Sequence, residues 1–227
     1  EQGGVKASYT HLRSDVASAI LDSSSNIGCP DSQLEGLISH LQATLAGDKK
    51  KQMLKNRIRN QSVERLGRLK KALRYCNAVI FDNNYDLGRN LHDVNYNGKT
   101  YRFSNLNLPS GEDVNVLPAL TAEEVKEHEL GLVKKIVAIN PSIQIFFLNY
   151  PVTAFERRAN PNYLTRESNA RFVNSFIKKG IEDNSLPENL TFIGCIDIPE
   201  HLLSKKGPLY FEDEVYQTFA KLIKNKL

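Results

Sequence analysis

Polar residues suited to acid–base or ligand-binding chemistry follow an apolar run near the middle of the chain. The run at residues 78–81 has the composition of a buried strand, and Asp82, Asn83, Asn84 and Asp86 come directly after it. Open α/β folds bind ligands at the edge of the sheet where parallel strands end. We therefore expect Asn83, Asn84 and Asp86 to line a substrate site, although such residues also commonly cap the next turn.

Two further strand ends supply charged residues. Asp197 and His201 follow the apolar run at residues 190–194, and an imidazole titrates near neutral pH, which suits a general base. We expect His201 to be the base and Asp197 to orient it, with an ordinary surface histidine as the alternative. Arg157, which follows the run at 142–148, would hold an anionic group of a substrate or make an ion pair within its own loop.

These residues need a scaffold of alternating helices and strands. Apolar spacing predicts helices in which Ser32, Thr121 and Thr165 are candidate caps, and Thr121 with Glu124 resembles a capping box. A basic amphipathic helix is expected between residues 49 and 75, with a break near Gln61. The remaining helices are predicted at residues 7–21, 32–47, 121–138, 165–179 and 212–224, and strands at 78–82, 142–148 and 190–194. This alternation predicts a mostly parallel sheet with helices on both faces.

Residues 83–120 interrupt the alternation. Asn97-Gly98 lies between two short apolar-polar segments, which is the strongest local signal for a two-residue β-hairpin. We predict a hairpin that projects from this insertion, just beyond the strand end, as a loop that covers a site.

Composition limits the class of protein. The chain has 227 residues, 41% hydrophobic and 25% charged, with no apolar run near the roughly 20 residues that a membrane helix needs. We expect one soluble domain, cytoplasmic or secreted, without a transmembrane segment. The cysteines Cys29, Cys76 and Cys195 lack metal-site spacing and are expected to be buried apolar residues.

Several segments together resemble the SGNH (GDSL-type) hydrolase superfamily, especially its GSCFA-like relatives. Asn26-Ile-Gly28 is similar to the second conserved block, residues 77–87 to the third, and residues 140–152 to the helix–strand unit that follows. Residues 209–220 resemble the last block, and Ser168-Asn-Ala170 also fits. The resemblance implies a three-layer α/β/α sandwich of flavodoxin-like topology, with four or five parallel strands, over residues 1–227.

The same resemblance implies an esterase or acyltransferase that acts on an ester or an acylated carbohydrate and needs no cofactor. Asn26, Gly28 and Asn83 or Asn84 would then contribute to an oxyanion hole. The last block departs from the family, since Tyr210 stands at the place of the base histidine and Gly207 at the place of its acid. A phenol with a pKa near 10 is a poor base at neutral pH, so His201 is the better candidate.

The first block of the family, a strand that ends in Gly-Asp-Ser, does not occur before Asn26. The serine in this block is the family's nucleophile, and its strand lies at the middle of the sheet. We therefore expect a strand upstream of Glu1, or another segment in its place, because an unpaired central strand leaves backbone groups unsatisfied.

Three alternatives to an SGNH-type ester hydrolase follow from the residues. The Tyr210 and Gly207 substitutions favour a catalytically inactive binding or interaction module. Metal-assisted hydrolysis through Asp82 and Asp86 would need further ligands. The serines at 23–25 offer a hydroxyl, but such a run before a short strand is typical of a turn.

The segment from Lys49 to Arg74 contains eleven Lys and Arg, although the net charge of the whole chain is only +4. A basic surface of this kind binds phosphate-rich partners. Aromatic side chains are scarce in the segment, so we favour a solvated helix face and do not expect nucleic acid as a partner.

Overall fold

The computed structural model describes residues 14–22, 27–82, 90–148, 161–193, 200–202 and 211–226. The chain forms two compact units, each built from two segments. Unit 1 comprises Glu1–Tyr75 and Arg89–Ala119, and unit 2 comprises Cys76–Gly88 and Leu120–Leu227. The single domain expected over residues 1–227 stays a prediction.

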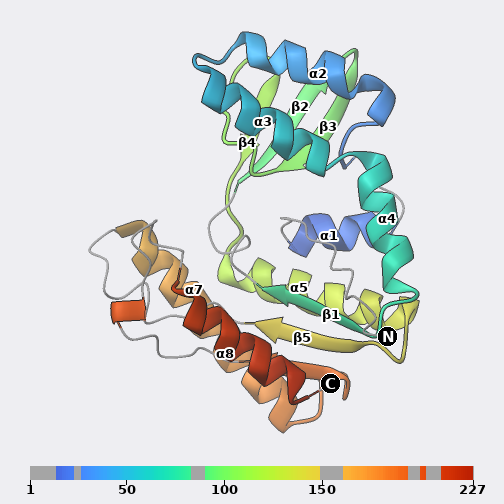
Figure 1. Cartoon of the computed structure of the whole chain (residues 1–227), viewed down its shortest axis with the longest axis vertical. Coiled ribbons are helices and arrows are strands. Elements are labelled where there is room, and N and C mark those ends of the chain that lie inside the picture. The colour runs from blue at the N-terminus through green and yellow to red at the C-terminus, as the bar shows by residue number, and fades with distance from the viewer. Residues whose placement is uncertain are drawn as a thin grey trace. The chain divides into compact units, whose positions relative to one another are not determined.

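The elements of the two units are labelled in Figure 1. Unit 1 contains α1 (Ser14–Leu21), α2 (Asp31–Ala43), α3 (Asp48–Asn60), α4 (Val63–Leu73), β2 (Leu91–Tyr96), β3 (Lys99–Ser104) and β4 (Val114–Leu117). Unit 2 contains β1 (Ala78–Asp82), α5 (Ala122–Ile139), β5 (Gln144–Leu148), α7 (Pro161–Glu182), β6 (Leu190–Ile193), the 3₁₀ turn η1 (Glu200–Leu202) and α8 (Asp213–Lys224).

The predicted hairpin is confirmed as the centre of an antiparallel sheet with strand order β3-β2-β4. Tyr96 pairs with Lys99, so Asn97 and Gly98 form the two-residue turn, with φ of 51° and 70°. Positive φ at both positions is the type I′ geometry that Asn-Gly favours. The third strand, β4, was not expected from the sequence.

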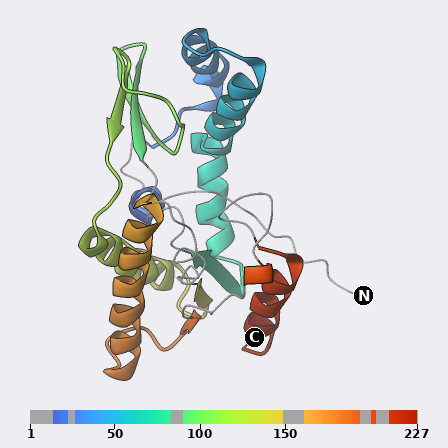
Figure 2. The same ribbon diagram turned by 90° about the vertical axis from the view of Figure 1, so that its left-hand side faces the viewer.

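The hairpin is not a projecting loop, so that part of the prediction is wrong, whereas its role as the cover of a site stays a prediction. Helices α2 and α3 lie along one face of its sheet (Figures 1 and 2). Val94, Tyr101 and Phe103 are buried on that face and pack against the apolar side chains of both helices. An apolar face of this size has to be covered, which explains why the insertion forms the core of unit 1.

The break predicted near Gln61 is confirmed between α3 and α4. Ser62 caps α4, since its side chain accepts the backbone N–H of Arg65 at 3.3 Å. The buried side chain of Gln61 bonds both backbone groups of Ser104: its amide nitrogen donates to the carbonyl at 2.8 Å, and its oxygen accepts the N–H at 2.7 Å. The break therefore joins the helices to the end of β3.

Unit 2 is built on a parallel sheet with strand order β1-β5-β6, as the three predicted strands required. Phe81, Phe147 and Phe192 occupy matching positions in the three strands. Their rings form a ladder across one face, with centroids 4.9 Å and 5.5 Å apart. On the other face, Phe146 and Ile193 pack with Ile223 of α8.

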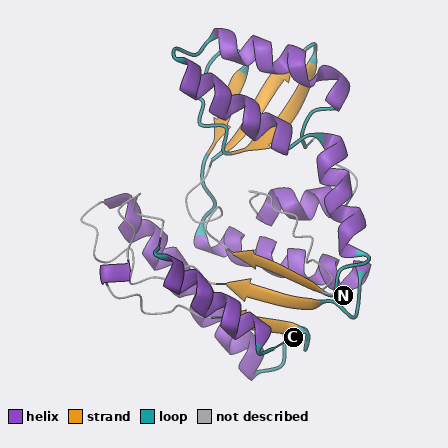
Figure 3. Cartoon of the chain, in the orientation of Figure 1, coloured by secondary structure: helices purple, strands orange, loops and turns teal. Residues whose placement is uncertain are grey.

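Helices lie on both faces of this sheet, with α5 and α7 on one and α8 on the other (Figures 2 and 3). The predicted capping box of α5 is confirmed, because Thr121 and Glu124 each bond the backbone N–H of the other. Thr165 is not a cap: α7 begins at Pro161, whose fixed φ suits the first turn of a helix. Ser32 is not a cap either, because α2 begins at Asp31 after Pro30.

The fold is thus mixed α/β, with a parallel three-stranded sheet and a smaller antiparallel one. In the part of the chain that the structure describes, β1 pairs with β5 alone, and residues 1–13 lie outside that part. The extra central strand and the flavodoxin-like three-layer topology stay predictions. None of the described helices is long and apolar enough to cross a membrane.

Candidate functional site

The three strands of the parallel sheet in unit 2 end at the same edge of the sheet. Asp82, the last residue of β1, pairs in register with Leu148, and Leu148 pairs with Ile193, the last residue of β6. All three strands run in the same direction, so the segments that follow them start side by side. This is the edge at which open α/β folds bind ligands.

Most of the predicted site residues belong to these segments. Asn83, Asn84 and Asp86 follow β1, Arg157 follows β5, and Asp197 follows β6. These five, together with Asn26 and Tyr210, lie outside the described residues. The topology therefore supports the prediction that these three segments start at one edge of the sheet, while the positions of their side chains stay a prediction.

His201 is described, and it lies on the surface of unit 2 in the turn η1. The next residue, Leu202, accepts the backbone N–H of Glu212 at 2.9 Å, and Glu212 is the N-cap of α8. Phe211 beside it is buried. The turn that carries His201 is thus fixed to the beginning of α8, and its imidazole is accessible to a ligand in solution.

Gly28 has an architectural role in unit 1. Its φ is +74°, and a Cβ at this position would lie 2.1 Å from the carbonyl oxygen of Gln61. Its N–H donates to the carbonyl of Arg102 at 2.9 Å, beside the bridge between Ile27 and Arg102. An N–H that is already bonded in this way is not available to an oxyanion, so its geometry gives the predicted role of Gly28 no support.

The two described cysteines are not activated nucleophiles. Burial, assisted by Glu64 and Asp31, raises the pKa of the Cys29 thiol to about 11. Burial also raises the pKa of Cys76, which is half-buried. Both thiols are therefore protonated at neutral pH, and only the thiolate attacks efficiently. The prediction of a buried apolar role is confirmed for Cys29 and is wrong for Cys76, which is only half-buried. Cys195 and the serines at 23–25 lie outside the described residues.

Within the described ranges, no group of three or more His, Cys, Asp and Glu side chains is arranged to hold a metal ion. Asp82 belongs to these ranges and is exposed, whereas Asp86 does not. The alternative of metal-assisted hydrolysis therefore gains no further ligand from the described side chains.

Sequence reasoning missed the buried positions of several polar residues, among them His92, Gln61 and Glu129. His92 is 2% exposed, and its ring nitrogens contact the backbone of Leu106 and Leu108 at 3.1 to 3.4 Å. Gln61 forms the two bonds to Ser104 described above. Glu129 of α5 is also buried, and its spacing from Val125 and Leu132 places it on the apolar stripe of the helix. That spacing is the signal by which Glu129 is recognisable in the sequence.

Comparison of the chain with protein-family models, curated proteins and solved structures finds no match. The resemblance to SGNH hydrolases therefore stays a prediction that rests on the motifs in the sequence.

Proposed function

We propose that unit 2 is an SGNH-like α/β unit that binds an ester or an acylated carbohydrate at the carboxyl edge of its parallel sheet and hydrolyses the ester or transfers the acyl group. The observation that supports this proposal is the register that ends β1, β5 and β6 at one edge. The segments that start there contain the amides, carboxylates and guanidinium expected of such a site. The finer three-layer, flavodoxin-like topology belongs to the same proposal.

In this proposal His201 is the general base. Its imidazole takes the proton from an attacking hydroxyl while the oxygen forms a bond to the ester carbonyl carbon, and it returns the proton to the departing alkoxide. Asp197 orients the imidazole, as the acid of a catalytic triad does. The amides of Asn83 and Asn84 would stabilise the oxyanion, and Arg157 would bind an anionic group of the substrate.

The test is turnover of p-nitrophenyl acetate and of an acetylated sugar by the full-length protein. We expect His201→Ala to lower the rate by about a hundredfold or more, the usual contribution of a general base. His201 is exposed, so this variant should fold normally. His40→Ala is the matched control, since His40 lies in unit 1, where its Nε2 lies 3.0 Å from a carboxylate oxygen of Asp113 at the surface. Equal rates for the two variants would remove His201 from the mechanism.

A second candidate function is a binding module without turnover. The bonded N–H of Gly28 favours it, because one expected oxyanion donor serves the fold instead. In this case acylated sugars would raise the melting temperature of the protein, by more for a tighter-binding sugar at the same concentration, without release of acetate. Release of acetate above the uncatalysed rate would exclude this candidate.

A further inference from the structure

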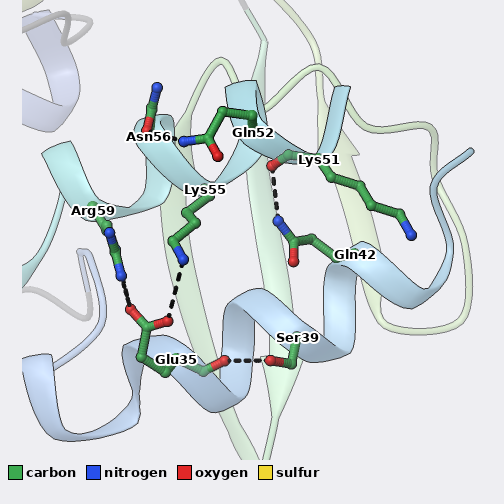
Figure 4. Close-up of polar contacts among 8 residues, drawn as sticks. All are labelled: Glu35, Ser39, Gln42, Lys51, Gln52, Lys55, Asn56 and Arg59. Atoms are coloured by element: carbon green, nitrogen blue, oxygen red, sulfur yellow. Dashed lines mark hydrogen bonds and ion pairs between the residues drawn. The ribbon is translucent and has the colours of Figure 1, made fainter. Parts of the chain in front are cut away.

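Three of the six basic residues of α3 make contacts inside unit 1. Lys55 and Arg59 both point toward Glu35 of α2 (Figure 4). The ammonium of Lys55 lies 3.7 Å from one carboxylate oxygen, and the guanidinium of Arg59 bonds the other. These contacts join α2 to α3 across the surface of the unit.

Two more basic side chains bond backbone carbonyls. Arg57 donates to the carbonyl of Leu106 at 3.2 Å, and Lys70 donates to that of Leu21 at 2.7 Å. Charge in this part of the segment therefore has a structural use.

A different set on α4 has no such partner. Arg65, Arg68, Lys71 and Arg74 are all exposed, and none of them makes an ion pair with a side chain that the structure describes. Helix residues three apart are surface neighbours, so the four cations form one oblique row across the exposed side of the helix. The row extends over about 14 Å along the helix axis and winds about half way round it, because each step of three residues turns the helix by about 300°. We call these four residues the basic row.

An aromatic side chain lies at the end of the basic row. Tyr75 is 84% exposed, the most exposed large hydrophobic side chain among the described residues. Its N–H still bonds the carbonyl of Ala72 at 3.0 Å, so it continues the last turn of α4 four residues after Lys71. Proteins bind single-stranded nucleic acid with this combination: bases stack on the exposed ring, and the cations contact the phosphates.

An anionic lipid surface fits the basic row less well than nucleic acid does. A helix that binds a lipid surface inserts an apolar face, but Leu66 and Leu73 of α4 are buried inside the unit. The single acid of α4, Glu64, is held by the backbone N–H of Asp31 at 3.0 Å and leaves the row itself without an acidic member.

We propose, contrary to the expectation from the sequence, that the basic row and Tyr75 form a binding surface for single-stranded nucleic acid. The four cations contact phosphates of the strand, and the phenol ring stacks on an unpaired base. This surface belongs to unit 1 and does not depend on the function proposed for unit 2.

The experiment measures fluorescence anisotropy of labelled oligouridylate, oligothymidylate and a duplex of equal length, with the full chain at increasing salt. Both single strands should bind more tightly than the duplex, and the ratio of the two affinities distinguishes RNA from DNA. The triple variant R65Q/R68Q/K71Q should bind about tenfold or more weakly and should lower the slope of log affinity against log salt by about 2, at roughly 0.7 per lost contact.

Two controls distinguish binding at a defined surface from attraction by the net charge of the protein. K49Q/K50Q/K51Q removes the same charge from α3. In Figure 4 the contact of Lys51 is made by its carbonyl, which accepts the side-chain amide of Gln42, and not by its ammonium. This variant should bind within about twofold of the wild type, because its charges lie outside the row and contribute only through screened long-range attraction. Tyr75→Ala should weaken single-strand binding by about tenfold, whereas Tyr75→Phe keeps the ring and the affinity.

Equal losses in the two triple variants would show attraction by net charge alone and overturn the proposal. Failure to bind either single strand, equal affinity for the duplex, or binding only to vesicles of anionic lipid would also overturn it. All substituted side chains except Lys51 are exposed, so melting temperatures should stay near the wild-type value. The charge-preserving variant R65K/R68K/K71R should retain binding and provides the test if the glutamine variant fails to fold.

Discussion

The two units use their polar residues differently. In unit 1, Gln61, His92 and the N–H of Gly28 are buried and bond the backbone of the antiparallel sheet or its adjoining loop. In unit 2, the described strands form an apolar ladder, and polar residues come after the strand ends. Buried polar groups that are fully bonded specify a fold but leave little for a ligand. The candidate residues for ester chemistry therefore belong to unit 2, whereas unit 1 offers a charged surface.

The largest effects should come from the two cores. Phe103 in unit 1 and Phe147 in unit 2 are 0% and 1% exposed. Each substitution to Ala removes a buried ring and should cost about 3 to 5 kcal/mol of unfolding free energy. Hydrogen exchange should show lost protection mainly in the unit that contains the substitution. Equal loss of protection in both units would show that they unfold together and would contradict the view that each unit has its own core.

The next effect concerns glycines with positive φ in unit 1. Gly28→Ala should cost about 3 kcal/mol, since the left-handed backbone disfavours a side chain and the new Cβ would meet the carbonyl of Gln61. Gly98→Ala is the matched control, with φ of +70° but open space around it. It should cost only about 1 to 2 kcal/mol in urea unfolding. A cost for Gly28→Ala as small as that of the control would mean that the close approach to Gln61 relaxes easily.

A pH-dependent effect should follow from His92. Burial, with help from the charge of Arg57, lowers the pKa of His92 below its usual 6.5, although backbone bonds at Leu108 and Asn90 oppose this shift. Above pH 6.5 both folded and unfolded states hold the neutral ring, so stability is at its full value. As the pH falls below 6.5, the unfolded state binds the proton first and stability declines. Urea unfolding at several pH values should show this decline of the unfolding free energy, and the decline should be smaller in His92→Gln. If the slope of unfolding free energy against pH is unchanged in this variant, His92 is not the source of the decline.

The smallest effect should come from the surface ion pairs shown in Figure 4. Glu35 is exposed, and its side-chain bond to Arg59 is the main reason why its pKa is lowered. Exposed ion pairs contribute little because water and salt screen them. Glu35→Gln should therefore leave the melting temperature close to the wild-type value in a calorimetric scan. A large loss would mean that this contact organises α2 and α3 more strongly than its exposure suggests.

Local signals predicted the elements well. Asn97-Gly98 specified its hairpin, Gln61 the break between α3 and α4, and Thr121 with Glu124 the start of α5, because each acts through neighbours in the sequence. The caps proposed at Ser32 and Thr165 were wrong, because Pro30 and Pro161 set the starts of those helices. A proline near a predicted cap is therefore the better indicator of where a helix begins.

Long-range relations were not predictable in the same way. The strand β4 is short, and nothing local distinguishes Val114–Leu117 from a loop until it pairs with β2. The packing of the hairpin against α2 and α3, and the bonds of Gln61 and Gly28, join residues that are far apart in the sequence. For the candidate site, the sequence indicated which residues follow strands, and the register of the strands supplied their common edge.

The chain passes from unit 1 to unit 2 and back before it completes either one. During synthesis, β1 leaves the ribosome long before its partner β5, whereas α2, α3 and the hairpin can associate as soon as β4 has emerged. Among the described strands, the apolar strand Ala78–Asp82 therefore has no partner until β5 emerges. In a growing polypeptide, an apolar strand in this state is a segment that chaperones bind.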